Sequence, residues 1–220
     1  MTKPLFVTDC DEVLLYMVTP FQAWLDNHKD IDFDLENGGF EGALTHRKDG
    51  SKVEPEEIWP LLGGFFDTEM ETQTPMPGAV ESLAEISEIA DVVILTNLTH
   101  ERNEARQVQL KRLGMDYPVY TNQGEKGPPL AKIIEKFSPS VSMFIDDLPM
   151  HHKSASIHTP DTWRLHMIGE EKLAPQVACA HKARYAHNRI DTWADALPWI
   201  MEKLEAGEPA PPIESATADI

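Results

Sequence analysis

The sequence predicts an α/β fold in which a mostly parallel sheet carries helices on both faces. Short apolar runs alternate along the chain with longer segments whose apolar residues recur at helical spacing, and this alternation is typical of βαβ units. Polar residues follow several of the apolar runs directly. Since ligands bind outside the carboxyl ends of the strands in open α/β sheets, those residues predict where a functional site lies.

The first predicted strand begins at Leu5 and stops at Asp9, and a second carboxylate follows at Asp11. The apolar run is too short to span a membrane and is typical of a buried strand. Residues 5–14 contain no Lys or Arg, so two acids at the end of a buried strand require an external cation or a proton. This stretch is the first indication of a metal site.

Residues 15–75 lack the strand–helix alternation, and we predict that they form a small, mainly helical insert, or cap. Phe21, Trp24 and Leu25 lie at helical spacing, and a second short helix is expected to end at the glycine pair Gly63-Gly64. The hinges of such a cap would lie at the two ends of this segment.

Residues 1–14 and 76–205 are predicted to form the core domain. After a helix with apolar residues every three positions over 80–89, strands are expected at 91–97, 117–120, 141–145 and 163–168, and helices at 100–113, 130–137, 149–157 and 190–205. Residues 206–220 are rich in proline, alanine and acid, and we expect them to form a disordered tail.

Composition restricts the classes of partner. The 220 residues carry a formal charge of -18, from 19 basic and 37 acidic residues, and such a surface repels nucleic acid and anionic membranes, so neither is expected as a partner. The sequence has no apolar run of ~20 residues and no signal-peptide pattern. With only Cys10 and Cys179, we expect a cytoplasmic protein with free thiols. The sequence leaves the oligomeric state open.

Four polar signals lie at or just after the predicted strands, in the order Asp9 with Asp11, Thr96 with Asn97, Lys126, and Asp146 with Asp147. Several carboxylates together form an oxygen-rich site that suits Mg²⁺. A Thr hydroxyl and a Lys ammonium can bind phosphoryl oxygens while charge shifts during transfer. One carboxylate can act as nucleophile and another as general acid and base.

This ordered set resembles the haloacid dehalogenase (HAD) superfamily, which consists mostly of phosphatases with a Rossmann-like fold. The matching segments are Asp9-Cys10-Asp11, Ile94-Leu95-Thr96-Asn97, Lys126 before Gly127-Pro128, and Phe144-Ile145-Asp146-Asp147. The resemblance extends from about residue 5 to about residue 170, with the insert at the first cap position of the family. It implies the sheet order 5-4-1-2-3.

The resemblance also implies a role for each matching residue. Asp9 would be the nucleophile and a magnesium ligand, and Asp11 the general acid and base, with its backbone carbonyl on the metal. Thr96, Asn97 and Lys126 would bind the phosphoryl group. The remaining magnesium ligands would be Asp146 and Asp147, the latter directly or through water.

One position departs from the family pattern. The family usually has glycine after the second acid, where this chain has Glu12. We expect an extended or helical backbone at Glu12, without a positive φ, and an additional acid near the site entrance. The acid at Asp11 favours phosphate chemistry over carbon–halogen cleavage, because the dehalogenases of the family lack it. Receiver domains use similar residues but with the acid pair first and the Lys last, which is the opposite order.

The expected function is therefore that of a Mg²⁺-dependent phosphatase that hydrolyses a small phosphorylated metabolite through an aspartyl-phosphate. The alternatives are a phosphotransferase or mutase of the same fold, and a binding protein with little or no turnover.

For several residues outside the matching segments, we favour a structural role over a functional one. His151 and His152 could add metal ligands, but a solvated helix start is the favoured interpretation. Arg47 and Lys48 could meet a substrate anion, but a solvated turn is favoured. The aromatic residues could line a substrate pocket in the cap, but we favour a role in the cap's own core for Trp24, Trp59, Phe65 and Phe66.

Overall fold

The computed structural model describes residues 2–35 and 42–213, and its largest sheet has six strands that pair in parallel throughout. The strands are β1 (Leu5–Thr8), β4 (Asp91–Thr96), β5 (Val119–Thr121), β6 (Ser142–Asp146), β7 (Trp163–His166) and β8 (Asn188–Arg189). They are arranged in the order β5-β4-β1-β6-β7-β8. Read from the opposite edge, the five predicted strands follow the expected order 5-4-1-2-3, and β8 adds a strand beside β7.

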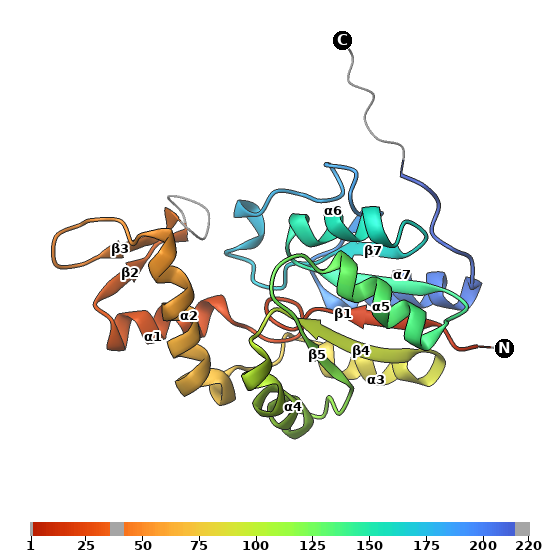
Figure 1. Ribbon diagram of the computed structural model, residues 1–220, viewed down its shortest axis with the longest axis horizontal. Helices are drawn as coiled ribbons and strands as arrows, with labels where there is room; N and C mark the ends of the chain where they lie inside the picture. The colour runs from red at the N-terminus through yellow and green to blue at the C-terminus, as the bar shows by residue number, and fades with distance from the viewer. Residues whose placement is uncertain (1, 36–41, 214–220) are drawn as a thin grey trace, which may run out of the picture.

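Helices cover both faces of this sheet (Figure 1). They are α3 (Ala79–Ile89), α4 (Asn103–Arg112), α5 (Gly127–Phe137), α6 (Pro149–His158) and α7 (Trp193–Ala206), with short 3-10 segments η4 (His100–Arg102) and η5 (Ala174–Gln176). Because side chains alternate along a strand, Phe6 of β1 packs in one core cluster with α3 and α7. Its neighbours Leu5 and Val7 pack in another cluster, with α5 and α6.

The insert lies to one side of the sheet in Figure 1. It contains α1 (Val18–His28), β2 (Ile31–Phe33), β3 (Leu44–His46), α2 (Pro55–Glu69) and η3 (Met70–Thr72). Phe21, Trp24 and Phe65 belong to a separate core cluster there, as expected for aromatic residues of a cap. Trp59 does not, since 75% of it is exposed. The antiparallel pair of β2 and β3 was not expected.

Helix α2 continues through Gly63-Gly64, where we expected it to end, and stops at Glu69. A Cβ on Gly64 would lie 3.0 Å from the Trp24 ring, so the missing side chain allows α1 and α2 to approach each other. A glycine inside a helix costs about 1 kcal/mol relative to alanine, and packing of the Trp24 ring against the helix offsets that cost.

The chain enters and leaves the insert at adjacent positions. The Tyr16 amide donates to the Thr74 carbonyl at 3.0 Å, and the Met76 amide donates to the Leu14 carbonyl at 2.8 Å. Leu15 also forms an antiparallel bridge with Pro75. The two connections between the core and the insert therefore form a short antiparallel ladder.

The segment that follows α7 differs from the expected disordered tail. Between Gly207 and Ile213, the Ala210 amide donates to the Asp161 carbonyl at 2.9 Å, and the Trp163 indole donates to the Glu208 carbonyl at 2.9 Å. Ala210 itself is buried. These bonds attach the segment to the end of the sheet that carries β7. The rest of the predicted tail, residues 214–220, lies outside the described residues.

Candidate active site at the carboxyl edge of the sheet

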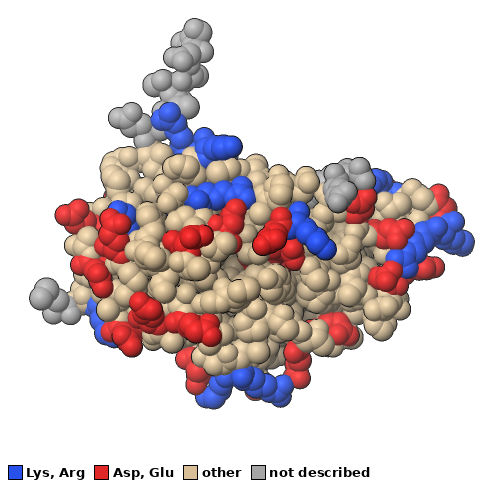
Figure 2. Space-filling view, turned by 180° about the vertical axis from the view of Figure 1, so that it is seen from behind, with Lys and Arg blue, Asp and Glu red and all other residues tan. Residues whose placement is uncertain are grey.

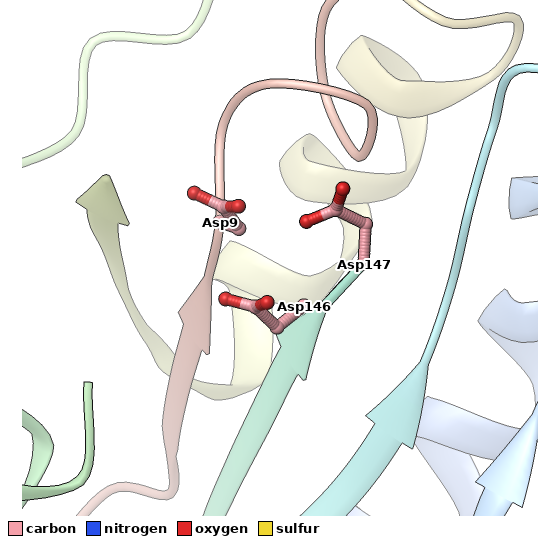
Figure 3. A group of neighbouring side chains, drawn as sticks. All are labelled: Asp9, Asp146 and Asp147. Atoms are coloured by element: carbon pink, nitrogen blue, oxygen red, sulfur yellow. The ribbon is translucent and has the colours of Figure 1, made fainter. Parts of the chain in front are cut away.

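Three carboxylates converge where β1 and β6 end (Figure 3). The two strands are parallel neighbours, with Thr8 opposite Ile145, so Asp9 emerges beside Asp146 and Asp147. One oxygen from each acid lies within 4.8 Å of the others, and all three residues are buried. The register of two central strands thus brings together acids that are far apart in the sequence.

Lys126 is the cation of this cluster. Its Nζ lies 2.6 Å from Asp9 Oδ1 and 2.8 Å from Asp146 Oδ2, and its side chain has no exposed surface. Burial alone would lower the pKa of Lys126, but the charges of Asp146 and Asp9 raise it above its usual value. Lys126 therefore remains charged and holds the ends of β1 and β6 together.

Three acids and one lysine leave two negative charges when all four groups are ionised. Burial raises the pKa of Asp9 to about 7, against the lowering effect of Lys126. Burial, with the charges of Asp146 and Asp9, raises the pKa of Asp147 well above its usual value. The Asp147 carboxylate has no hydrogen-bond or ion-pair partner among the described residues. Buried oxygen ligands with this excess of charge fit a hard divalent cation such as Mg²⁺.

Thr96 provides a free hydroxyl at the same edge. It is the last residue of β4, it is 1% exposed, and its Oγ1 is buried without a partner among the described residues. A buried hydroxyl that lacks a partner is costly, so it is a candidate donor to a bound anion. The side chain of Asn97 serves the loop instead, because its Nδ2 donates to the Gly124 carbonyl at 2.9 Å. Asn97 is exposed and its side chain is engaged with the loop. Its backbone amide is therefore the group that remains as a candidate anion contact.

Asp11 is held by two donors that the sequence did not indicate. Arg106 Nη2 lies 3.0 Å and 3.1 Å from the two oxygens of Asp11, and Gln73 Nε2 donates to Asp11 Oδ1 at 2.8 Å. Arg106 also reaches Cys10 Sγ at 3.3 Å. The only sequence signal for such contacts is the polar character of the helix predicted over 100–113, which lacks a clear apolar stripe.

The overall fold is similar to several solved structures. A HAD family hydrolase from Deinococcus radiodurans, with bound phosphate and sodium, is 18% identical with a TM-score of 0.64, over 91% of this chain and 96% of that one. The chain has the HAD fold. A predicted phosphoglycolate phosphatase from Haemophilus somnus is 14% identical with a TM-score of 0.60, over 89% of this chain and 97% of that one. A putative β-phosphoglucomutase from Thermotoga maritima is 12% identical with a TM-score of 0.60, over 91% of this chain and 99% of that one. No family model and no curated protein matches the sequence.

Glu12 differs from the expectation for its position in the HAD fold. Its φ is 63°, in the left-handed region that favours glycine, whereas we expected an extended or helical backbone. Its carboxylate is buried rather than placed at the entrance, and Oε1 accepts from the amides of Met17 and Val18 at 2.8 and 2.6 Å. Burial raises the pKa of Glu12 to about 7. The left-handed backbone turns this acid towards the start of α1, where it caps the helix.

We expected the histidine pair that follows the acids to be solvated, and this expectation is wrong: His151 is 1% and His152 0% exposed. Neither belongs to the group of possible metal ligands among the described residues. His152 Nε2 donates to the Asp146 carbonyl at 2.9 Å, and His166 Nε2 donates to the Asp147 carbonyl at 2.7 Å. Burial lowers the pKa of His152 to about 3. These neutral imidazoles fix the backbone of the acid pair in the HAD fold.

Arg47 lies in the turn after β3, as predicted, and is engaged by acids of the insert. It donates to Asp26 and, at 2.7 Å, to Asp32. These ion pairs occupy its guanidinium, so the structure gives no support to a substrate contact there.

Proposed function

We propose that this chain is a Mg²⁺-dependent phosphatase that hydrolyses a small phosphorylated metabolite through an aspartyl-phosphate at Asp9. The observation that carries the proposal is the buried group of Asp9, Asp146 and Asp147, two of which pair with the buried Lys126. The free Thr96 hydroxyl beside it supports an anion site. The proposed setting is the cytoplasm, where free thiols such as those of this chain remain reduced.

In the proposed reaction, a carboxylate oxygen of Asp9 forms a bond to phosphorus while the bond to the leaving oxygen breaks. Asp11 gives the leaving oxygen its proton. Asp11 then takes a proton from the water whose oxygen attacks phosphorus. The bond between Asp9 and phosphorus breaks, and inorganic phosphate leaves. The sum is one water consumed, with one alcohol and one phosphate released.

Other side chains hold charge during these steps. Lys126, with its pKa kept high by Asp146 and Asp9, binds a phosphoryl oxygen, and Thr96 donates to another. The acids Asp9, Asp146 and Asp147, with the Asp11 carbonyl, would hold Mg²⁺, which supplies positive charge that offsets the repulsion between carboxylate and phosphate. The low exposure of these residues favours a small substrate, since the site is almost completely covered.

The test is phosphate release from a panel of phosphorylated metabolites, with Mg²⁺ and after its removal with EDTA. The parent protein is expected to release phosphate only with the metal, and Asp9→Asn to lose at least about 10³-fold, because the nucleophile is removed. Asp116→Asn is the matched control, since Asp116 is exposed and its ion-pair partner among the described residues is Lys111. Equal rates for Asp9→Asn and the parent would refute the mechanism.

The same assay separates hydrolysis from transfer. Addition of an alcohol acceptor is expected to leave the yield of inorganic phosphate unchanged. A transferred phosphate that exceeds the free phosphate would instead support the phosphotransferase or mutase alternative.

A further inference from the structure

One face of α4 and η4 contacts the insert along its length. Arg102 donates to Asp67 at 2.8 and 3.0 Å, Gln109 donates to the Met70 carbonyl, and Arg112 pairs with Glu71 at 2.9 Å. Residues 102, 106, 109 and 112 follow helical spacing and therefore share a face. Arg106 lies between the others, with its guanidinium 5.5 Å from the centre of the Phe66 ring.

Arg106 differs from its neighbours on that face because its side chain is completely buried and its ion-pair partner among the described residues is Asp11. A buried guanidinium without a counter-charge is strongly unfavourable. Any rotation of Asp11 away from Arg106 would leave the guanidinium in that state. A single nitrogen of Arg106, Nη2, contacts both carboxylate oxygens, while Nη1 reaches Cys10 Sγ. The guanidinium is therefore held on both sides, and its contact with both oxygens restricts the orientation of the Asp11 carboxylate.

Gln73 gives Asp11 a second fixed contact, and this one comes from the exit of the insert. Its Nε2 donates to Asp11 Oδ1 at 2.8 Å and to the Tyr16 carbonyl at 3.1 Å, so it joins both connections of the insert to the same carboxylate. Gln73 is 1% exposed. The orientation of Asp11 therefore depends on groups that lie on, or pack against, the insert.

We propose that Arg106 is a positioning residue that, together with Gln73, orients the Asp11 carboxylate for proton transfer and makes that orientation depend on the docked insert. The proposal rests on the proposed function, because it assigns Asp11 the proton-transfer role. Arg106 touches Asp11 and not the phosphoryl site formed by Lys126 and Thr96. Its loss is therefore expected to change the chemical step more than substrate binding.

The test compares two substrates that differ in their need for a proton. The 4-nitrophenolate of 4-nitrophenyl phosphate leaves readily without protonation, whereas an alkoxide does not. The second substrate is the alkyl phosphate that the parent protein hydrolyses best. Arg106→Met, which keeps the length of the side chain but removes its charge, is expected to lower kcat/KM for the alkyl phosphate by roughly 10- to 100-fold, part of the usual contribution of general acid catalysis. The loss for 4-nitrophenyl phosphate is expected to be at least several-fold smaller, with KM nearly unchanged.

Two variants accompany the measurement. Arg112→Ala removes a contact on the same face of α4, but its pair with Glu71 is exposed, so both substrates should keep their parent kinetics. Gln73→Met carries the test if Arg106→Met does not fold, and it is expected to show the same selective loss for the alkyl phosphate at a smaller size. Arg106→Lys, which restores the charge but not the planar guanidinium that contacts both Asp11 and Cys10, should recover part of the loss.

The outcomes separate the two proposals. Equal losses on both substrates for an active parent would show a merely structural role and overturn the positioning proposal alone. A parent that hydrolyses 4-nitrophenyl phosphate but no alkyl phosphate would also overturn it, because Asp11 would then donate no proton. A parent without metal-dependent activity on any phosphate ester would refute the proposed function, and the role of Arg106 in proton transfer with it.

Discussion

Glu12 satisfies two opposing demands at a single position. Its left-handed backbone (φ 63°) costs about 1–2 kcal/mol for a residue with a side chain. In return, its carboxylate accepts from two amides at the start of α1, which otherwise lack a partner within the helix. The residue after the acid motif therefore connects the loop of Asp9 and Asp11 to the first helix of the insert.

Replacement of Glu12 separates these effects. Glu12→Ala and Glu12→Gly both remove the cap, which is worth about 1–2 kcal/mol, but only glycine relieves the backbone. We expect Glu12→Gly to be more stable than Glu12→Ala by about 1 kcal/mol in urea denaturation, the reverse of the usual order in ordered segments. An alanine variant at least as stable as the glycine variant would contradict this account.

At the residue scale, the sequence predicted the acids at 9, 146 and 147, and the structure brings them together with Lys126. Each lies at a strand end or opens a helix, so apolar runs and chain order sufficed to predict their positions. The partners of Asp11 could not be predicted, because Arg106 is 95 residues away and reaches it only through the tertiary packing of α4. The φ of Glu12 was missed because a carboxylate at that position gives no sign of what it will cap.

The contact of α5 with α6 is the element-scale feature that positions Lys126. Gly127 begins α5 and packs so closely on α6 that a Cβ would lie 2.5 Å from both the Ser154 carbonyl oxygen and Oγ. The Gly127 amide also donates to Ser154 Oγ at 3.1 Å. A larger residue there would push the start of α5, and the adjacent Lys126, away from Asp9.

Gly127→Ala is therefore expected to lower the free energy of unfolding by about 2 kcal/mol or more, as overpacking against backbone does, and to reduce kcat as Lys126 shifts. Thermal unfolding and the phosphate-release assay measure the two effects. Gly63→Ala is the matched control in α2, because among the described residues its new methyl group meets the flexible end of Arg102, at 3.2 Å, and no backbone atom outside its own helix. It should be neutral or stabilising by up to about 1 kcal/mol. Similar losses in both variants would argue against the steric explanation.

At the element scale, the strands of the core were predicted because their apolar runs are buried on both faces. The pair of β2 and β3 was missed because three residues per strand give too little alternation to identify. The edge strand β8 has two residues and gives even less. The continuation of α2 through Gly63-Gly64 depends on the Trp24 ring, a tertiary contact that local helix propensity does not include.

At the scale of the whole molecule, acidic residues outnumber basic ones, and they also form the candidate site. Figure 2 shows acidic side chains spread over much of the face seen there, consistent with the net charge of -18. No helix among the described residues has the length and apolar character needed to cross a bilayer. The unusual feature is that part of this negative charge is buried, at Asp9, Asp146 and Asp147.

This buried charge predicts a coupling between metal, pH and stability. Because the pKa of Asp9 rises from 3.8 to about 7 on folding, the metal-free native state binds more protons than the unfolded state between these values, and its stability falls as pH rises. A divalent cation binds the deprotonated acids, so its stabilising effect should grow with pH. We expect Mg²⁺ to raise Tm by several degrees more at pH 8 than at pH 5.5.

The difference between samples with and without Mg²⁺ isolates this effect. His152 and His187, with pKa values lowered by burial to about 3 and about 4, destabilise the protein as pH falls below about 6.5. They do so equally in both samples, so their contribution cancels. Asp147→Asn should reduce the Mg²⁺-dependent shift at pH 8, and a shift independent of pH would contradict the coupling.

The ladder between the two connections of the insert has a consequence for engineering. With the amide of Met76 bonded to the carbonyl of Leu14, the ends of a sixty-residue excursion already lie at hairpin distance. A tight turn could bridge these ends with little loop-closure entropy. A foreign domain could also be inserted between the same two connections. Strand β1, which leads to the proposed nucleophile Asp9, would keep its path in either chimera. The part of the chain beside the candidate site could therefore be exchanged while the site residues of the core stay unchanged.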